Sequence, residues 1–159
     1  MVTKQAKVLF LATANAARGQ MAEAFVRHYA GDQYDAYSAG LAPMEIHPLT
    51  RQVMDEVGID ISGQQSVNVA EYLGKTHFGY IITVCSSAEA ACPRTFLGVS
   101  HRLYWDMDDP TKFEGSPEET LVKFREVRDE VDARVKAWLA DPNAGSTLMD
   151  WEKTAAAGS

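Results

Sequence analysis

Arg18 and the small residues before it are suited to binding an anion. The run from Ala12 to Ala17 separates a short apolar segment at 8–11 from Arg18. The apolar segment is typical of a strand buried on both faces, and apolar residues between 21 and 29 recur at the spacing of an amphipathic helix. The first N–H groups of a helix lack internal partners, and a guanidinium can bind two oxygens at once. We therefore expect this stretch to bind a phosphate-like oxyanion.

Two cysteines lie near the end of another apolar segment. Cys85 follows residues 79–84, and Cys92 comes seven positions later, directly before Pro93. Cysteines in a cytosolic chain are most often small buried residues, but the position of Cys85 at the end of a strand beside an anion loop leaves a redox role open. Residues seven apart on a helix lie about 10.5 Å apart along its axis, whereas a disulfide needs Cα atoms within about 7 Å. A Cys85–Cys92 bridge would therefore have to unwind the segment between them.

Asp109 can supply acid–base chemistry. Asp109-Pro110 follows the apolar segment 103–105, and an Asp-Pro pair in this position is most often a turn. A carboxyl group that faces an anion loop can also protonate a departing oxygen. The four histidines are scattered without paired ligand spacing, so we expect no metal site.

Alternating strand-like and helix-like segments would position these groups. Short apolar runs at 8–11, 34–39, 79–84 and 103–105 alternate with helical patterns at 19–31, 48–58, 66–73 and 116–138. Ser116 and Glu119 have the spacing of a capping box, and Asn68 is a candidate helix cap. This order favours an α/β fold with a parallel sheet and helices on both faces. The carboxyl ends of parallel strands meet at one edge, so we expect Ala12, Cys85 and Asp109 to lie together.

The loop sequence resembles that of the thioredoxin-coupled arsenate reductases, which share the low-molecular-weight tyrosine phosphatase fold. The family loop reads Cys-Thr-x-Asn-x-x-Arg-Ser-Gln-Met-Ala-Glu, and the chain matches it at Thr13, Asn15, Arg18, Gln20, Met21, Ala22 and Glu23. It departs from the pattern at Ala12 and Gly19. For residues 7–139 the resemblance implies a three-layer fold with a four-stranded parallel sheet in the order 2-1-3-4. It also implies an oxyanion loop made of Thr13, Ala14, Asn15, Ala16, Ala17, Arg18 and Gly19.

The resemblance further implies a role for each reactive position. Ala12 occupies the place of the nucleophilic cysteine, while Cys85 and Cys92 match the family's redox segment. Asp109 matches the general acid, and we prefer it to Asp108 and Asp106 because it directly precedes the proline. The implied substrate is arsenate, with phosphate or sulfate as analogues, and the implied reductant is external thioredoxin. No tightly bound cofactor is implied.

The resemblance leaves a potassium site open. Some relatives hold a potassium ion with residues that correspond to Asn15, Glu23, Ser66 and Asn68. Only Asn15 and Glu23 match the family well here. Asn15 and Ser38 are expected to brace the loop through side-chain hydrogen bonds.

Two other functions are compatible with the sequence. A low-molecular-weight tyrosine phosphatase would have the same loop, but aromatic residues usually follow its Asp-Pro, and Thr111-Lys112 follow here. A non-catalytic oxyanion-binding module would need Arg18 but neither the acid nor the two thiols. We therefore expect an arsenate reductase in which Ala12 replaces the nucleophile, so that the chain as written is inactive or trapped.

Composition sets the remaining limits. The formal net charge of −7 argues against nucleic acid or an anionic membrane as partner. No apolar stretch approaches the roughly 20 residues of a spanning helix, and the start of the chain lacks the apolar core of a signal peptide. We expect a cytoplasmic protein with one domain at 1–139. Residues 140–159 lose all periodicity and are expected to be a tail, in part a cloning remnant.

Overall fold

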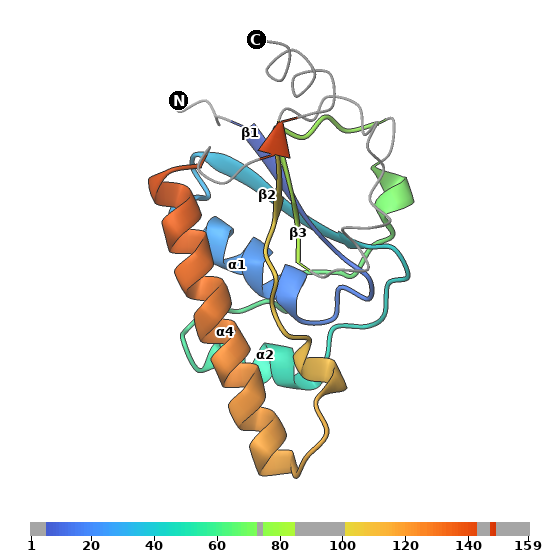
Figure 1. The fold of residues 1–159 in the computed structure, drawn as a ribbon, viewed down its shortest axis with the longest axis vertical. Coiled ribbons are helices and arrows are strands. Elements are labelled where there is room, and N and C mark those ends of the chain that lie inside the picture. Colours follow the sequence, from blue (N-terminus) through green and yellow to red (C-terminus); the bar gives the residue numbers. More distant parts are fainter. Residues whose placement is uncertain (1–5, 73–74, 85–100, 143–146, 149–159) are drawn as a thin grey trace.

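Five strands form a single sheet, and helices pack against it (Figure 1). The computed structural model describes residues 6–72, 75–84, 101–142 and 147–148. The strands are β1 (Ala6–Ala12), β2 (Tyr34–Gly40), β3 (Tyr80–Thr83), β4 (His101–Tyr104) and β5 (Thr147–Leu148). The α-helices are α1 (Arg18–Ala30), α2 (Pro48–Asp55) and α4 (Pro117–Ala140), and single 3-10 turns form η1 (Val69–Glu71) and η2 (Pro110–Lys112).

The sheet has the order β2-β1-β3-β4-β5. The first four strands are parallel, so the predicted order 2-1-3-4 is confirmed. The central strand β1 pairs with β2 over its whole length and with β3 from Val8 to Leu11. The fifth strand lies in the segment that the sequence predicted to be an unstructured tail. It runs antiparallel to β4, with Leu148 opposite His101 and Thr147 opposite Arg102.

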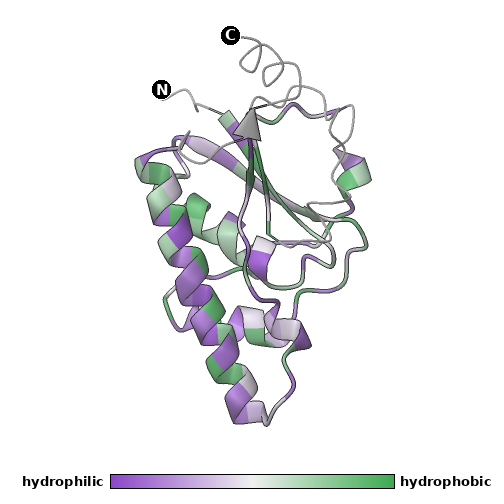
Figure 2. Ribbon diagram, viewed as in Figure 1, coloured by the Kyte–Doolittle hydropathy of each residue, from purple (hydrophilic) through white to green (hydrophobic). Residues whose placement is uncertain are grey.

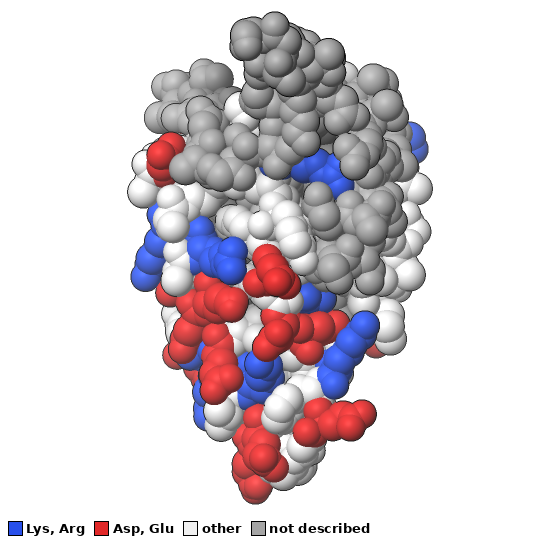
Figure 3. All heavy atoms as spheres, viewed as in Figure 1, with Lys and Arg blue, Asp and Glu red and all other residues white. Residues whose placement is uncertain are grey.

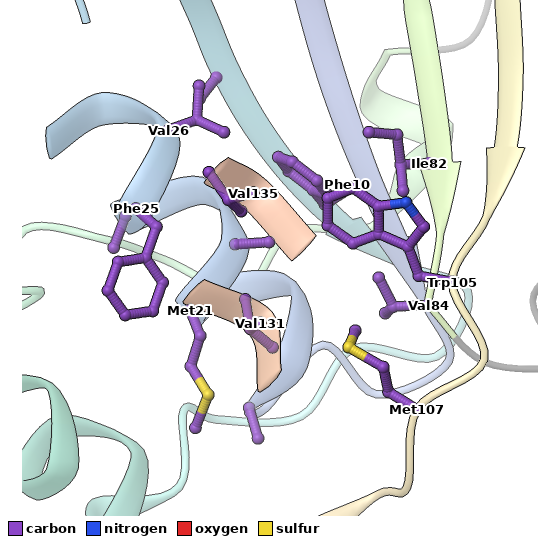
Figure 4. Packing of buried hydrophobic residues seen from close by; sticks show 14 of the residues in the cluster. Phe10, Met21, Phe25, Val26, Ile82, Val84, Trp105, Met107, Val131 and Val135 are labelled. Carbon is purple, nitrogen blue, oxygen red and sulfur yellow. The ribbon is translucent and has the colours of Figure 1, made fainter. Parts of the chain in front are cut away.

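Alternate side chains of β1 enter two different hydrophobic clusters, because successive residues of a strand point to opposite faces. Val8 and Phe10 belong to the larger cluster, which α1, α2 and α4 complete. Figure 4 shows its centre, where the rings of Phe10 and Trp105 lie 5.6 Å apart. Leu9 and Leu11 face the smaller cluster, which includes residues of η1 and the segment before β3. Both faces of the central strand are therefore buried, as its continuous apolar run predicts.

The helices begin and end largely where the sequence signals predict. Ser116 and Glu119 form the predicted capping box at the start of α4. Hydrophobic residues recur along α4 among hydrophilic ones (Figure 2), and five of them belong to the larger cluster: Phe124, Val127, Val131, Val135 and Trp138. The regular part of α2 ends at Asp55, three residues before the predicted end. Gly58, at φ 80°, then closes a Schellman turn, in which the N–H groups of Gly58 and Ile59 donate to the carbonyls of Asp55 and Met54.

The short helix predicted at 66–73 is confined to a 3-10 turn in the described residues 66–72. This turn is η1, and Asn68 caps it as expected by accepting a hydrogen bond from Ala70 N–H. The cause is competition from the sheet. Gly40 N–H donates to the carbonyl of Val67, and Gly40 and Asn68 form a parallel bridge, so the start of the segment is held extended beside β2. Strand β4 also begins two residues earlier than predicted, with the polar pair His101 and Arg102.

Charged side chains of both signs are interspersed around α4 on the face shown in Figure 3. Lys123 pairs with Asp108 at 2.7 Å, and Glu56 pairs with Arg125 and Arg128 at 2.7 and 2.8 Å. Within the described ranges, no helix has the length and apolar character needed to cross a membrane.

Candidate active site

The loop between β1 and α1 turns its carbonyl groups outwards. Backbone N–H groups of segment 41–47 donate to four of its carbonyls: Leu41 to Ala12 at 3.1 Å, Ala42 to Thr13 at 2.8 Å, Met44 to Ala14 at 2.9 Å and His47 to Ala16 at 3.0 Å. None of the described peptide bonds is cis. In a trans peptide the following N–H points opposite to the carbonyl. The N–H groups of residues 13, 14, 15 and 17 therefore point to the inner side of the loop, which is the arrangement of an anion-binding nest.

Asn15 sets the curvature of this loop. Its φ of 53° is left-handed, the only such value for a described residue other than glycine, and its side chain is buried. Asparagine tolerates this conformation better than most residues. Its Nδ2 donates to Ser38 Oγ at 3.0 Å, and its carbonyl accepts from Gln20 Nε2 at 3.1 Å. The strained residue is thus held by hydrogen bonds at both ends, and Ser38 braces the loop in the way that the sequence suggested.

Helix α1 begins at the loop without a side-chain cap. Its N-cap residue, Ala17, has no oxygen to accept from the first turn, and no acidic residue lies in that turn. The first N–H groups of a helix have no partner within the helix. A bound anion can take the place of the missing cap, and the helix dipole favours negative charge there.

Arg18 joins the ends of three parallel strands. Its side chain is 8% exposed. Nη1 donates to the carbonyls of Val84 at 2.9 Å, just beyond β3, and of Met107 at 2.8 Å, beyond β4. Nη2 lies 3.4 Å from Asp109 Oδ2. The guanidinium is therefore fixed at the carboxyl edge of the sheet, where ligands of open α/β sheets bind.

Asp109 faces the loop. Its Oδ1 accepts hydrogen bonds from Thr111 N–H at 3.0 Å and Thr111 Oγ at 2.7 Å, which leaves Oδ2 on the side of Arg18. Asp108, by contrast, is exposed and pairs with Lys123, whose hydrogen bond holds the pKa of Asp108 below its usual value. Asp106 is also exposed. A small pocket is lined by Ala12, Ala14, Asn15, Ala16, Ala17, Arg18, Asp109 and Thr111.

A buried polar chain lies behind the loop. Ser38 Oγ donates to Glu23 Oε1 at 2.8 Å, and Glu23 pairs with Arg27 at 2.8 Å. Burial raises the pKa of Glu23 above its usual value, against the hydrogen bonds from Ser38 and Arg27, which lower it. This arrangement keeps the carboxyl group away from the inner side of the loop.

The four residues considered for a potassium site, Asn15, Glu23, Ser66 and Asn68, make different contacts in the structure. Asn15 Oδ1 is buried and has no hydrogen-bond partner in the described part of the chain, so it could accept a cation. Glu23, however, is already paired with Arg27, and Asn68 Oδ1 caps η1. Ser66 Oγ donates to the Ala14 carbonyl at 3.3 Å. Each of the other three side chains thus has a protein partner. No group of three or more His, Cys, Asp or Glu within the described ranges could hold a metal ion.

Gly19, the second departure from the family pattern, has a steric explanation. A Cβ added at Gly19 would collide with Asn15 Oδ1. The side chain of Asn15 thus fills the space that a serine at position 19 would need. A serine at position 19 would therefore require the Asn15 side chain to shift.

The structure brings most of the predicted site residues together, and the two cysteines lie outside the residues that it describes. The loop residues from Ala12 to Arg18 and the Asp109 carboxyl group surround one small pocket or support it. Cys85 and Cys92 lie outside the described residues, although Val84, directly before Cys85, contacts Arg18. The supporting side chains Gln64 and Thr50 carry no motif in the sequence and were missed. Thr50 Oγ donates to the Ala16 carbonyl at 2.8 Å.

Comparisons with known proteins give consistent results. Residues 7–148 match the model of the low molecular weight phosphotyrosine protein phosphatase family. An arsenate reductase from Shouchella clausii is 42% identical over 130 residues, which cover 81% of this chain and 91% of that protein. A solved arsenate reductase in the phosphate binding state has a TM-score of 0.70 and 30% identity, over 87% of this chain and 98% of that one. A thioredoxin-dependent arsenate reductase from Corynebacterium glutamicum has a TM-score of 0.64 and 29% identity, over 88% of this chain and 63% of that one.

Proposed function

The chain belongs to the low molecular weight phosphotyrosine protein phosphatase family, and on this basis we propose that it is an arsenate reductase in which Ala12 replaces the nucleophilic cysteine. Its full-length relatives at about 40% identity are arsenate reductases, which supports an oxidoreductase over a phosphatase. The observation that carries the proposal is the loop itself. The loop directs backbone N–H groups, Arg18 and Asp109 toward one small pocket. At position 12 this pocket is lined by the methyl group of an alanine.

As written, the chain binds a tetrahedral oxyanion without converting it. Arsenate, phosphate and sulfate share the size and charge that the loop from Thr13 to Gly19 accommodates. A relative has been solved in a phosphate binding state. Arg18 supplies two further donors once an anion competes with Asp109 for its Nη2 group. Without a thiol at position 12, no bond to arsenic can form.

A cysteine at position 12 would complete a relay of three thiols. Its thiolate attacks arsenic(V), and an As–O bond breaks while Asp109 gives its proton to the departing oxygen. Cys85 then attacks the sulfur at position 12, and the S–As bond breaks with its electron pair left on arsenic, which departs as arsenite. Cys92 attacks the sulfur of Cys85, so the thiolate at position 12 is released and a Cys85–Cys92 disulfide remains. The dithiol of thioredoxin reduces this disulfide, and a thioredoxin-dependent relative supports this choice of reductant.

Arg18 supports the approach of Cys85 in this scheme. Its Nη1 donates to the carbonyl of Val84, which directly precedes Cys85. The same nitrogen donates to Met107, two residues before Asp109. One guanidinium thus fixes the backbone that leads to the second thiol and the backbone that leads to the acid.

Sulfate binding tests the oxyanion site. We expect calorimetry to show binding of sulfate to the present chain and to detect none in Arg18→Ala, because the loop then loses its only guanidinium. Arg51→Ala removes an exposed arginine of α2 and is the matched control. Equal sulfate affinity of the present chain and Arg18→Ala would refute the site.

Ala12→Cys separates reductase from phosphatase. We expect this variant to reduce arsenate in the presence of thioredoxin and thioredoxin reductase, and to hydrolyse p-nitrophenyl phosphate weakly at most. Adding Cys85→Ser should abolish turnover of arsenate, because the second thiol is missing. Robust phosphate ester hydrolysis that persists with Cys85→Ser, without arsenate reduction, would assign the chain to the phosphatases.

A further inference from the structure

We propose that Gln20 and Gln64 are positioning residues that fix the direction of the Asn15–Ala16 peptide in the oxyanion loop. The inference rests on the proposed oxyanion site and assigns a task to two side chains that contact no substrate. Gln20 is fully buried at the start of α1, and Gln64 is 8% exposed in the segment between α2 and η1. Buried amides at a loop of this kind need a reason, because each must satisfy its hydrogen bonds without water.

The carbonyl of Asn15 is held differently from its neighbours. The carbonyls of Ala12, Thr13, Ala14 and Ala16 each accept a backbone N–H from segment 41–47. The carbonyl of Asn15 instead accepts from the side chain of Gln20 at 3.1 Å. Among the described residues, its direction therefore depends on the side chain of Gln20, at the residue whose backbone is left-handed.

The two glutamines hold each other in a defined orientation. Gln20 Nε2 donates one proton to the carbonyl of Asn15 and the other to the carbonyl of Gln65 at 3.2 Å. Its Oε1 accepts from Gln64 Nε2 at 2.8 Å, and Gln64 Nε2 also donates to the backbone carbonyl of Gln20 at 3.1 Å. Both protons of each amide thus face an acceptor. This pairing fixes the orientation of the Gln20 amide, with its nitrogen toward the loop. In the reversed orientation, the amide oxygen of Gln20 would face the carbonyl oxygens of Asn15 and Gln65 without a proton between them.

The direction of this peptide decides whether the N–H of Ala16 or the carbonyl of Asn15 faces a bound anion. While Gln20 holds the Asn15 carbonyl outwards, the N–H of Ala16 points to the inner side of the loop. Without that hydrogen bond, the peptide loses the contact that fixes its direction and can rotate about the ψ of Asn15 and the φ of Ala16. Rotation would turn the carbonyl inwards and replace a donor with an acceptor. Gln20 therefore acts on the anion through Ala16, and Gln64 acts through Gln20.

The test compares sulfate binding in single and double variants of the present chain. We expect Gln20→Met, which keeps the length of the side chain without its amide, to weaken sulfate binding about tenfold, as for one lost hydrogen bond. Gln64→Met should weaken binding about threefold. The double variant should bind no more weakly than Gln20→Met, because Gln64 has no effect once Gln20 is gone. Gln52→Met makes the same change at an exposed position of α2 and should bind like the parent.

A second readout separates positioning from general stability. In NMR spectra, we expect Gln20→Met to shift or broaden the amide resonance of Ala16, while that of Val26, farther along α1, stays unchanged. Sulfate affinity within twofold of the parent in a folded Gln20→Met would overturn the inference, as would losses that multiply in the double variant. If Gln20→Met does not fold, parent-like affinity in Gln64→Met overturns it. Absence of sulfate binding in the parent itself would instead refute the proposed function.

Discussion

Burial controls the acid–base behaviour of Glu23. Its side chain lies on α1 behind the oxyanion loop, where Ser38 and Arg27 donate to it. Loss of hydration is nevertheless the largest influence, and it raises the pKa of Glu23 above the ordinary value of 4.5. The folded chain therefore holds this proton more tightly than the unfolded chain does. The contribution of Glu23 to stability is fully present below pH 4.5 and is lost as the pH rises through the raised pKa.

Glu23→Gln should remove this pH dependence. We expect the free energy of unfolding of the parent to fall more steeply than that of the variant as the pH rises above 4.5, by at most about 1.4 kcal/mol per pH unit. Urea unfolding at several pH values measures both curves. Glu118→Gln, at an exposed position of α4, is the control and should run parallel to the parent. Parallel curves for Glu23→Gln and the parent would contradict the prediction.

At the scale of elements, the start of α4 depends on a local signal. Ser116 Oγ accepts from Glu119 N–H at 3.1 Å, and Glu119 Oε1 accepts from Ser116 N–H at 3.1 Å. Ser116→Ala should lower the free energy of unfolding by about 1 kcal/mol, because two N–H groups lose partners or orientation. Ser116→Asp keeps an oxygen at the N-cap and should lie close to the parent. Equal midpoints of urea unfolding for all three chains would show that the capping box does not contribute to the free energy of unfolding.

Local signals account for what the sequence predicted of the elements, and long-range contacts account for what it missed. The strand at 8–11 and the helix after Ser116 follow from runs and caps that adjacent residues define. The helix expected at 66–73 begins late because Val67 and Asn68 pair with Gly40, a contact that no local pattern records. Residues 73–74 lie outside the described ranges.

The candidate site shows the same division. Arg18 was predicted to bind an anion from its place after a small-residue loop. Its hydrogen bonds to Val84 and Met107 join residues 66 and 89 positions apart, so the sequence could not show them. The pairing of Gln20 with Gln64 spans 44 positions and was missed for the same reason. The site assignments of Cys85 and Cys92 stay predictions.

At the scale of the whole molecule, β5 and the oxyanion loop lie at opposite ends of the parallel strands. Strand β5 pairs with His101 and Arg102 at the start of β4, whereas the loop and Arg18 lie at the carboxyl ends of the strands. Removal of residues 143–159 should lower the free energy of unfolding by about 1–2 kcal/mol, from the lost ladder and the exposed edge of β4. Sulfate affinity should stay within twofold of the parent. Calorimetry and urea unfolding of the shortened chain measure both, and a large loss of affinity would show that the tail contributes to the site.

The contacts of Arg18 have a consequence for synthesis of the chain. Its guanidinium reaches Val84 and Met107, which the ribosome adds long after Arg18. A nascent chain that has not yet reached Met107 lacks one of these acceptors, and it also lacks Asp109. Closing such long loops is slow compared with forming a helix. Affinity for an oxyanion therefore arises late, when β1, β3 and β4 have come together, so the first moment of anion capture marks the assembly of these parallel strands.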